Sequence, residues 1–147
     1  MRFNLDPFDY YTDDQLWQVL EQVEMKGSIA SLPNKLQEIV QEGGANFSAG
    51  QRQLICIARV LLRNPCILVL DEATASIDSN TDIKIQKTIR NCFCNSTVLT
   101  IAHRINTIID SDKILVLDHG RVIEFGPPHE LLKIDKGIFK SLYETQN

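Results

Sequence analysis

Two short stretches of this sequence combine residue types that bind anions and cations. Ser48 and Gln51 have the spacing of a capping box, in which the two side chains accept hydrogen bonds from backbone N–H groups at the start of a helix. The first N–H groups of such a helix point outward at the positive end of its dipole, which favours an anion. Asp71 and Glu72 follow an apolar run. Two acids at such a place suggest a cation and a water molecule.

The apolar run before these acids, residues 67–70, is short and partly β-branched. Such a run is typical of a central parallel strand that is buried on both faces, and ligands bind at the carboxyl ends of these strands. Residues 97–102 predict a second buried strand, which would bring His103 to the same edge of the sheet. A lone histidine after a strand is usually a loop residue, but beside an acid pair we interpret His103 as part of the same site.

The order of these motifs resembles that of the ATP-binding-cassette (ABC) ATPases. Residues 47–51, Phe-Ser-Ala-Gly-Gln, look like the ABC signature, and residues 67–72 look like the Walker B strand with the glutamate that follows it. Residues 76–78 resemble the D-loop, and residues 101–104 resemble the segment that carries the switch histidine. Several elements in the right order make the resemblance specific.

The sequence of these motifs is most similar to that of one branch of this family. Phe47 begins the signature, with Asn46 before it and Arg-Gln-Leu at residues 52–54 after it, as in the second nucleotide-binding domain of the multidrug resistance-associated proteins, subfamily C. Residues 1–8 and 97–112 look most like the fourth type of that group. The resemblance covers essentially the whole chain.

This resemblance implies an α/β fold, a P-loop NTPase-like ABC ATPase domain of which the chain would be the C-terminal part. Residues 1–65 would form the helical subdomain with the signature helix, and residues 66–147 the C-terminal half of the RecA-like ATPase core, with the Walker B half of its parallel sheet. No GxxxxGK followed by Ser or Thr occurs in these 147 residues. The Walker A loop and lysine that hold the β- and γ-phosphates are therefore absent from this sequence. We expect a piece of a nucleotide-binding domain, cut from a longer polypeptide or translated from an internal Met, and inactive alone.

The chemistry that the resemblance implies is hydrolysis of ATP at a Mg²⁺ ion, coupled to export of organic anions or xenobiotics across a membrane. Asp71 would hold the Mg²⁺ through water, Glu72 would be the general base, and His103 would contact the γ-phosphate. Asp78 would couple this site to its neighbour across a dimer.

The signature residues Ser48, Ala49, Gly50 and Gln51 would bind the nucleotide of another domain, because two nucleotide-binding domains stack head to tail in this family. Ala49 replaces the first glycine of the common signature, and its methyl group crowds the approach of a phosphate. The implied partners are that second domain and the transmembrane domains of the same transporter. The chain would lie at the cytoplasmic face of the plasma membrane and meet the membrane only through its parent protein.

Length, composition and charge restrict the classes of protein to which the chain can belong. A length of 147 residues, with 44% hydrophobic residues, is enough for one domain with a core. A net charge of −4 without a basic stripe argues against nucleic acid, and no apolar run is long enough to span a bilayer. The cysteines lack paired zinc spacing, so we expect reduced thiols, with Cys56 and Cys66 buried.

Local patterns predict the elements around these motifs. Thr12 and Gln15 form a second capping box, which begins a helix whose apolar stripe ends near Gly27. The signature helix runs to Arg63, and another helix follows residue 78. Strands at 113–117 and 121–125 are joined by a tight turn, and two short helices, near 130–133 and 137–144, close the chain.

Two other functions stay open at this point. A chromosome-maintenance or DNA-repair ATPase of the ABC superfamily has the same motifs, but no heptad arm lies on either side of them here. The second alternative is a non-catalytic fragment that docks on another nucleotide-binding domain through its signature face or D-loop. Nucleotide binding by the chain would discriminate between the alternatives.

Overall fold

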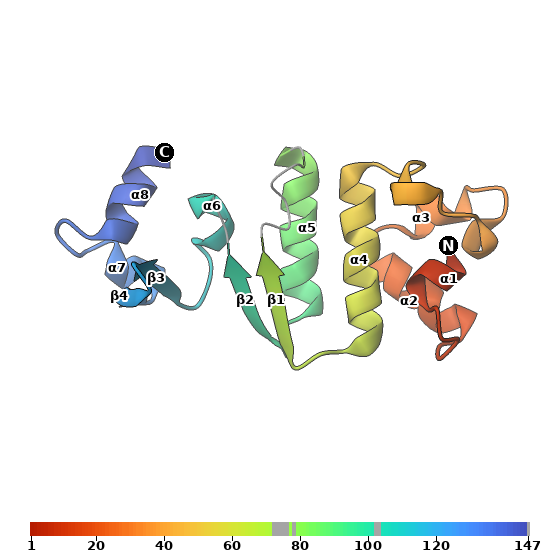
Figure 1. Cartoon of the computed structure of the whole chain (residues 1–147), viewed down its shortest axis with the longest axis horizontal. Helices are drawn as coiled ribbons and strands as arrows, with labels where there is room; N and C mark the ends of the chain where they lie inside the picture. Colours follow the sequence, from red (N-terminus) through yellow and green to blue (C-terminus); the bar gives the residue numbers. More distant parts are fainter. Residues whose placement is uncertain (72–76, 78, 102–103, 147) are drawn as a thin grey trace. The chain divides into compact units, whose positions relative to one another are not determined.

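The computed structural model describes residues 1–71, 77, 79–101 and 104–146 (Figure 1). The chain forms two compact units, Met1–Leu99 and Thr100–Asn147, and each unit has a hydrophobic core of its own. The predicted boundary between residues 65 and 66 concerns functional subdomains and stays a prediction. Among the described residues, no helix is long and apolar enough to cross a bilayer.

The first unit is mainly helical. Its helices are α1 (Arg2–Leu5), α2 (Asp13–Gln22), α3 (Lys26–Ala30), η1 (Lys35–Gln37), η2 (Glu42–Gly44), α4 (Ala49–Arg63) and α5 (Ser79–Cys92). The predicted Thr12–Gln15 capping box is present, with the Thr12 N–H donating to Gln15 Oε1 at 2.9 Å. The predicted end of this helix near Gly27 is wrong. Glu24 adopts the left-handed conformation that ends the helical region, with φ of 57°, and Gly27 lies inside α3.

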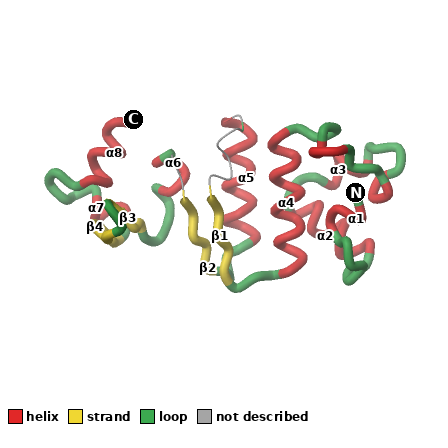
Figure 2. Tube along the Cα trace, in the orientation of Figure 1, coloured by secondary structure: helices red, strands yellow, loops and turns green. Residues whose placement is uncertain are grey.

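Helix α4 lies between α2 and α5 and packs against both of them (Figures 1 and 2). Its buried stripe includes Leu54, Ile55 and Ala58, which join the core of the unit. The Arg59 guanidinium donates a hydrogen bond to Asn4 Oδ1, which connects α4 to α1. The helix ends as predicted at Arg63, because Asn64 takes a left-handed conformation with φ of 43°.

Strands β1 (Ile67–Asp71) and β2 (Thr97–Ile101) form a two-stranded sheet, and their arrows point in the same direction in Figure 1. The predicted burial of β1 on both faces is not observed. Leu68 is buried, whereas Ile67 is 67% exposed and Val69 is 58% exposed. Leu68 belongs to the core of the first unit, whereas the side chains of Ile67 and Val69, on the other face of β1, are more than half exposed.

The cysteine side chains also differ from the prediction of burial. Cys56 and Cys66 are both exposed, and all four cysteines are free thiols. Cys56 lies outside the buried stripe of α4. A position in a largely apolar helix was therefore not enough to predict that the side chain is buried. Burial instead raises the pKa of the half-buried Cys92 thiol, and Cys94 adds to this effect.

The second unit contains α6 (Ile105–Ile108), β3 (Ile114–Asp118), β4 (Arg121–Gly126), α7 (Pro128–Leu131) and α8 (Ile138–Gln146). β3 and β4 form the predicted antiparallel hairpin. His119 and Gly120 both have positive φ in its turn, at 46° and 75°, which suits the right-handed twist of the two strands. The two predicted closing helices are present as α7 and α8, but α7 begins at Pro128, two residues before the predicted segment at 130–133.

Candidate functional site

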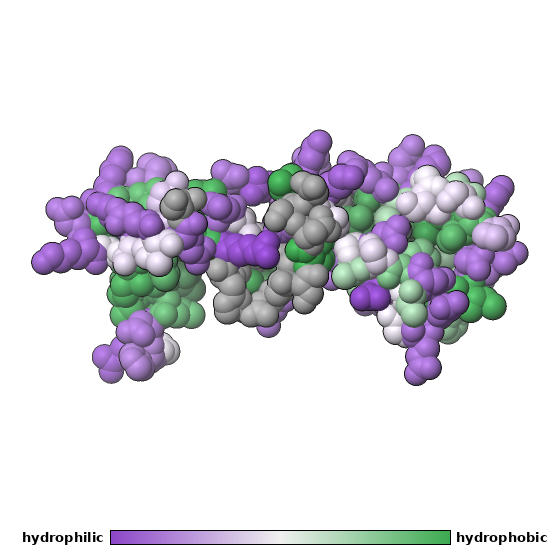
Figure 3. Space-filling model, turned by 90° about the horizontal axis from the view of Figure 1, so that it is seen from above, coloured by the Kyte–Doolittle hydropathy of each residue, from purple (hydrophilic) through white to green (hydrophobic). Residues whose placement is uncertain are grey.

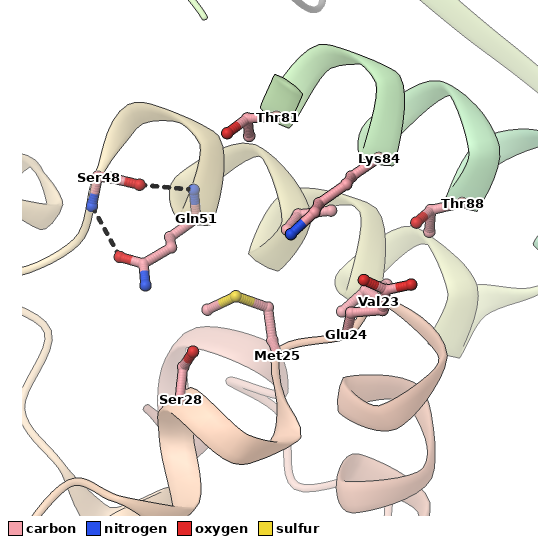
Figure 4. Close-up of a pocket in the computed structure, with 10 residues that line it drawn as sticks. Val23, Glu24, Met25, Ser28, Ser48, Gln51, Thr81, Lys84 and Thr88 are labelled. Carbon is pink, nitrogen blue, oxygen red and sulfur yellow. Dashed lines mark hydrogen bonds between the residues drawn. The ribbon is translucent and has the colours of Figure 1, made fainter. Parts of the chain in front are cut away.

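The start of α4 has the geometry that the sequence predicts. The Gln51 N–H donates to Ser48 Oγ at 3.2 Å, and the Ser48 N–H donates to Gln51 Oε1 at 2.9 Å (Figure 4). The capping box thus satisfies these two N–H groups and leaves those of Ala49 and Gly50 as the other donors of the first turn. Ser48 is exposed and Ala49 is half-buried, so an anion can reach this end of the helix.

The loop before α4 is held by the residues that flank the signature. Arg52 donates to the carbonyl oxygens of Gly44 at 3.4 Å and Phe47 at 3.3 Å. Asn46 accepts from the Gln41 N–H at 3.2 Å and donates to a backbone carbonyl oxygen, and the Phe47 side chain is buried. These contacts fix the direction in which the chain approaches Ser48.

Gly50 has a packing role at this site. It is buried, and a Cβ atom in its place would overlap Thr81 Cγ2 and lie 3.3 Å from Thr81 Cβ. The absence of a side chain at Gly50 therefore allows α4 and the first turn of α5 to lie in contact. The predicted role of Gly50 in nucleotide binding stays a prediction beside this structural one.

Asp71 is the last residue of β1, and it is exposed at the carboxyl end of the strand. Glu72, Asp78 and His103 lie outside the described residues, so their predicted convergence with Asp71 is untested. Within the described ranges, no three metal-ligating side chains gather at one place. Mg²⁺ is commonly held through one or two carboxylates, water and phosphate oxygens, and the exposed Asp71 carboxylate fits that manner of binding.

A pocket of about 320 Å³ lies beside the start of α4. Its lining residues come from three places: the corner between α2 and α3, the side of α4 that carries Ser48 and Gln51, and one face of α5. The α5 residues are Thr81, Lys84 and Thr88, which sequence reasoning missed (Figure 4). Their spacing of three and four residues is the signal that could have placed them on one helix face.

The fold defines the class of protein to which the chain belongs. The structure is similar to that of a bacterial Atm1-family ABC exporter with ATP bound, with a TM-score of 0.86 and 36% sequence identity over 99% of this chain and 25% of that one. The family model for ABC transporters matches residues 3–75. The chain belongs to the ABC transporter family, and it has the fold of part of an ABC ATPase domain. The predicted family and fold class are confirmed.

Individual relatives place the chain among the multidrug resistance-associated proteins. It is 57% identical to the probable multidrug resistance-associated protein lethal(2)03659 of Drosophila melanogaster. The alignment covers 97% of this chain and 10% of that protein. It is 53% identical to ATP-binding cassette sub-family C member 4 of Homo sapiens, in an alignment that covers 98% of this chain and 11% of that protein. The chain therefore spans about a tenth of the length of these curated relatives.

Proposed function

We propose that this chain supplies two functional parts to the ATP-hydrolysing domain of an exporter. One part is the group of residues at the end of β1 that serve the nucleotide of their own domain. The other is the start of α4, which covers the nucleotide of a second domain in a head-to-tail dimer. The observation that carries the proposal is that one helix, α4, has an exposed capping box at its start and leads at its end into the strand that carries Asp71.

Each residue has a distinct task in this proposal. Asp71 would hold Mg²⁺ through water, and the chemistry that the ion would supply is neutralisation of charge on phosphate oxygens. Glu72 accepts a proton from the attacking water, and His103 donates a hydrogen bond to the γ-phosphate. Asp78 couples the two sites of the dimer. Ser48, Ala49, Gly50 and Gln51 present the positive end of α4 to the partner's nucleotide.

The transported substrates that we propose are organic anions or xenobiotics, and the site of action is the cytoplasmic face of the plasma membrane. The support for this is the similarity to multidrug resistance-associated proteins over nearly the whole chain. The partners are the second nucleotide-binding domain and the transmembrane domains of the same transporter.

Two substitutions in the transporter that contains this chain test the division of tasks. Glu72→Gln keeps the shape of the side chain and removes the base, so nucleotide should still bind and close the dimer while turnover falls by about 10²-fold or more. Ser48→Arg places a long cation at the start of α4 and should block closure over the partner's nucleotide. We expect trapped nucleotide for the first variant and reduced trapping for the second. If both variants gave the same open, nucleotide-free state, the tasks assigned to Glu72 and Ser48 would be wrong.

The 147-residue chain itself should not hydrolyse ATP. Mg²⁺ held by Asp71 would leave most phosphate oxygens unpaired, since the sequence contains no GxxxxGK motif whose lysine and backbone donors would bind them. Steady-state phosphate release by the chain, compared with its Glu72→Gln variant, checks this. Release above that control would contradict the prediction, whereas release at the control level agrees with a fragment that acts only by docking on another nucleotide-binding domain.

A further inference from the structure

The pocket beside α4 has an apolar floor and a mixed polar wall. Val23, Met25 and Leu54 line it, and each of these side chains is less than a tenth exposed. Its volume of about 320 Å³ lies within the range of about 300–1,000 Å³ that small-molecule sites occupy. A ligand with a compact apolar body can therefore be accommodated.

One buried polar group in this pocket makes no hydrogen bond to a described residue. Thr88 is only 6% exposed, and its hydroxyl group points toward the pocket (Figure 4). A threonine in a helix can hydrogen-bond to a carbonyl oxygen one turn earlier, but Thr88 does not. This hydroxyl group is therefore available to exchange a hydrogen bond with a molecule in the pocket.

The charges that line the pocket have opposite signs and come from different elements. Lys84 extends from α5 toward the pocket, and Glu24 lies at the corner between α2 and α3 (Figure 4). The left-handed backbone of Glu24, with φ of 57°, is part of the tight turn that brings its side chain to the pocket. Neither side chain forms an ion pair with any residue in the described part of the chain. Both charges are thus available to a ligand.

We propose that this pocket binds a small zwitterion with an apolar body, the chemical class of the apolar amino acids. The carboxylate of the ligand pairs with Lys84, its ammonium group pairs with Glu24, and Thr88 donates a hydrogen bond to the carboxylate. The apolar body packs on Val23, Met25 and Leu54. This binding needs no ATP hydrolysis, but the pocket shares Ser48 and Gln51 with the start of α4 that we propose to cover the partner's nucleotide.

The sequence offers a direct probe of the pocket. It contains two methionines, Met25 in the pocket lining and Met1 outside it. NMR spectra of the full chain labelled with ¹³C at the methionine methyl groups therefore report on the pocket and carry an internal control. L-leucine is the probe, and 4-methylpentanoate and 3-methylbutylamine are matched molecules that lack the ammonium group and the carboxylate, respectively.

We expect L-leucine to shift the Met25 resonance to saturation in the millimolar range and to leave Met1 in place. Both matched molecules should bind more weakly. Lys84→Gln and Glu24→Gln should each weaken binding by about tenfold or more, because each removes a charge-assisted contact. Thr88→Val keeps the shape of the side chain and should weaken binding several-fold. Lys87→Gln, on the same helix but outside the lining, is the matched control and should bind like the unmodified chain.

Three results would overturn the proposal. The first is the absence of a saturable Met25 shift with L-leucine. The second is equal binding of the three molecules, which would indicate apolar contact alone. The third is equal affinity of the Lys84→Gln and Lys87→Gln variants, which would mean that the ammonium group of Lys84 does not meet the ligand.

Discussion

Gly50 belongs to the signature and also packs against Thr81 of α5 in the first unit. Gly50→Ala adds a methyl group against Thr81 Cγ2, and relief of such an overlap requires movement of α4 or α5. We expect Gly50→Ala to lower the free energy of unfolding by about 1–3 kcal/mol, the usual cost of overpacking. Denaturant unfolding followed by circular dichroism measures the loss.

A second substitution separates packing from other effects of Gly50. Thr81→Ser removes Cγ2 and keeps the hydroxyl group, so Gly50→Ala combined with Thr81→Ser should recover most of the lost stability. If the stability loss of the double variant equalled the sum of the losses of the two single variants, the contact between residue 50 and Thr81 Cγ2 would not be the cause of the Gly50→Ala effect.

The residues of the site differ in how far the sequence alone could predict them. Ser48 and Gln51 were predictable because a capping box depends on residues three positions apart, and its hydrogen bonds are present. Lys84 and Thr88 were not predicted, because their importance depends on α5 lying beside the corner between α2 and α3. The roles predicted for Asp71, Glu72, Asp78 and His103 stay predictions.

At the scale of elements, the start of α8 depends on one carboxylate from the hairpin. Glu124 of β4 accepts hydrogen bonds from the N–H groups of Ile138 at 2.5 Å and Phe139 at 3.1 Å. Phe139 is only 1% exposed and belongs to the core of the second unit. The contact therefore positions both the first turn of α8 and a core side chain.

Glu124→Ala should lower the stability of the second unit by about 1–3 kcal/mol, because it leaves two N–H groups of α8 without their acceptor. Glu144→Ala removes an exposed carboxylate from the last turns of the same helix and serves as the matched control. Hydrogen exchange of the α8 amides provides the measurement. Equal protection of α8 in the two variants would exclude the proposed role of Glu124.

Most elements follow from local sequence, and the errors have a common physical origin. The helices after Thr12 and Ser48 and the hairpin turn at His119 and Gly120 are determined by neighbouring residues, and they were predicted. The exposure of Ile67, Val69 and Cys56 was not predicted. Burial depends on which other layers cover a strand or helix, and the periodicity of a single element does not contain that information.

At the scale of the whole molecule, both units expose apolar strand residues. Ile67 and Val69 are more than half exposed in the first unit, and Leu117 and Phe125 are 60% and 61% exposed in the second. Apolar surface of the second unit is visible in green in Figure 3. Exposed apolar strands are templates for association. We therefore expect the chain to self-associate, as a concentration-dependent increase of mass in light scattering.

A pair of matched variants locates this association. Val69→Lys places a charge on the exposed face of β1 and should reduce the average mass. Ile39→Lys changes a side chain of similar size that is 75% exposed outside the strands, and it should leave the mass unchanged. A monomer at all concentrations, or an equal effect of the two variants, would contradict the role of the strand surface.

Helix α4 has a mechanical consequence beyond the chemistry at its two ends. Its 15 residues form a rod about 22 Å long, anchored to α1 through Arg59, near the end that leads into β1. Ser48 lies about 16 Å from Arg59 along the helix axis, so a tilt of about 5° at Arg59 would displace Ser48 by about 1.4 Å, which exceeds the tolerance of a hydrogen bond. In the proposed dimer, a small rotation near Arg59 would therefore move Ser48 into or out of reach of a phosphate of the partner's nucleotide.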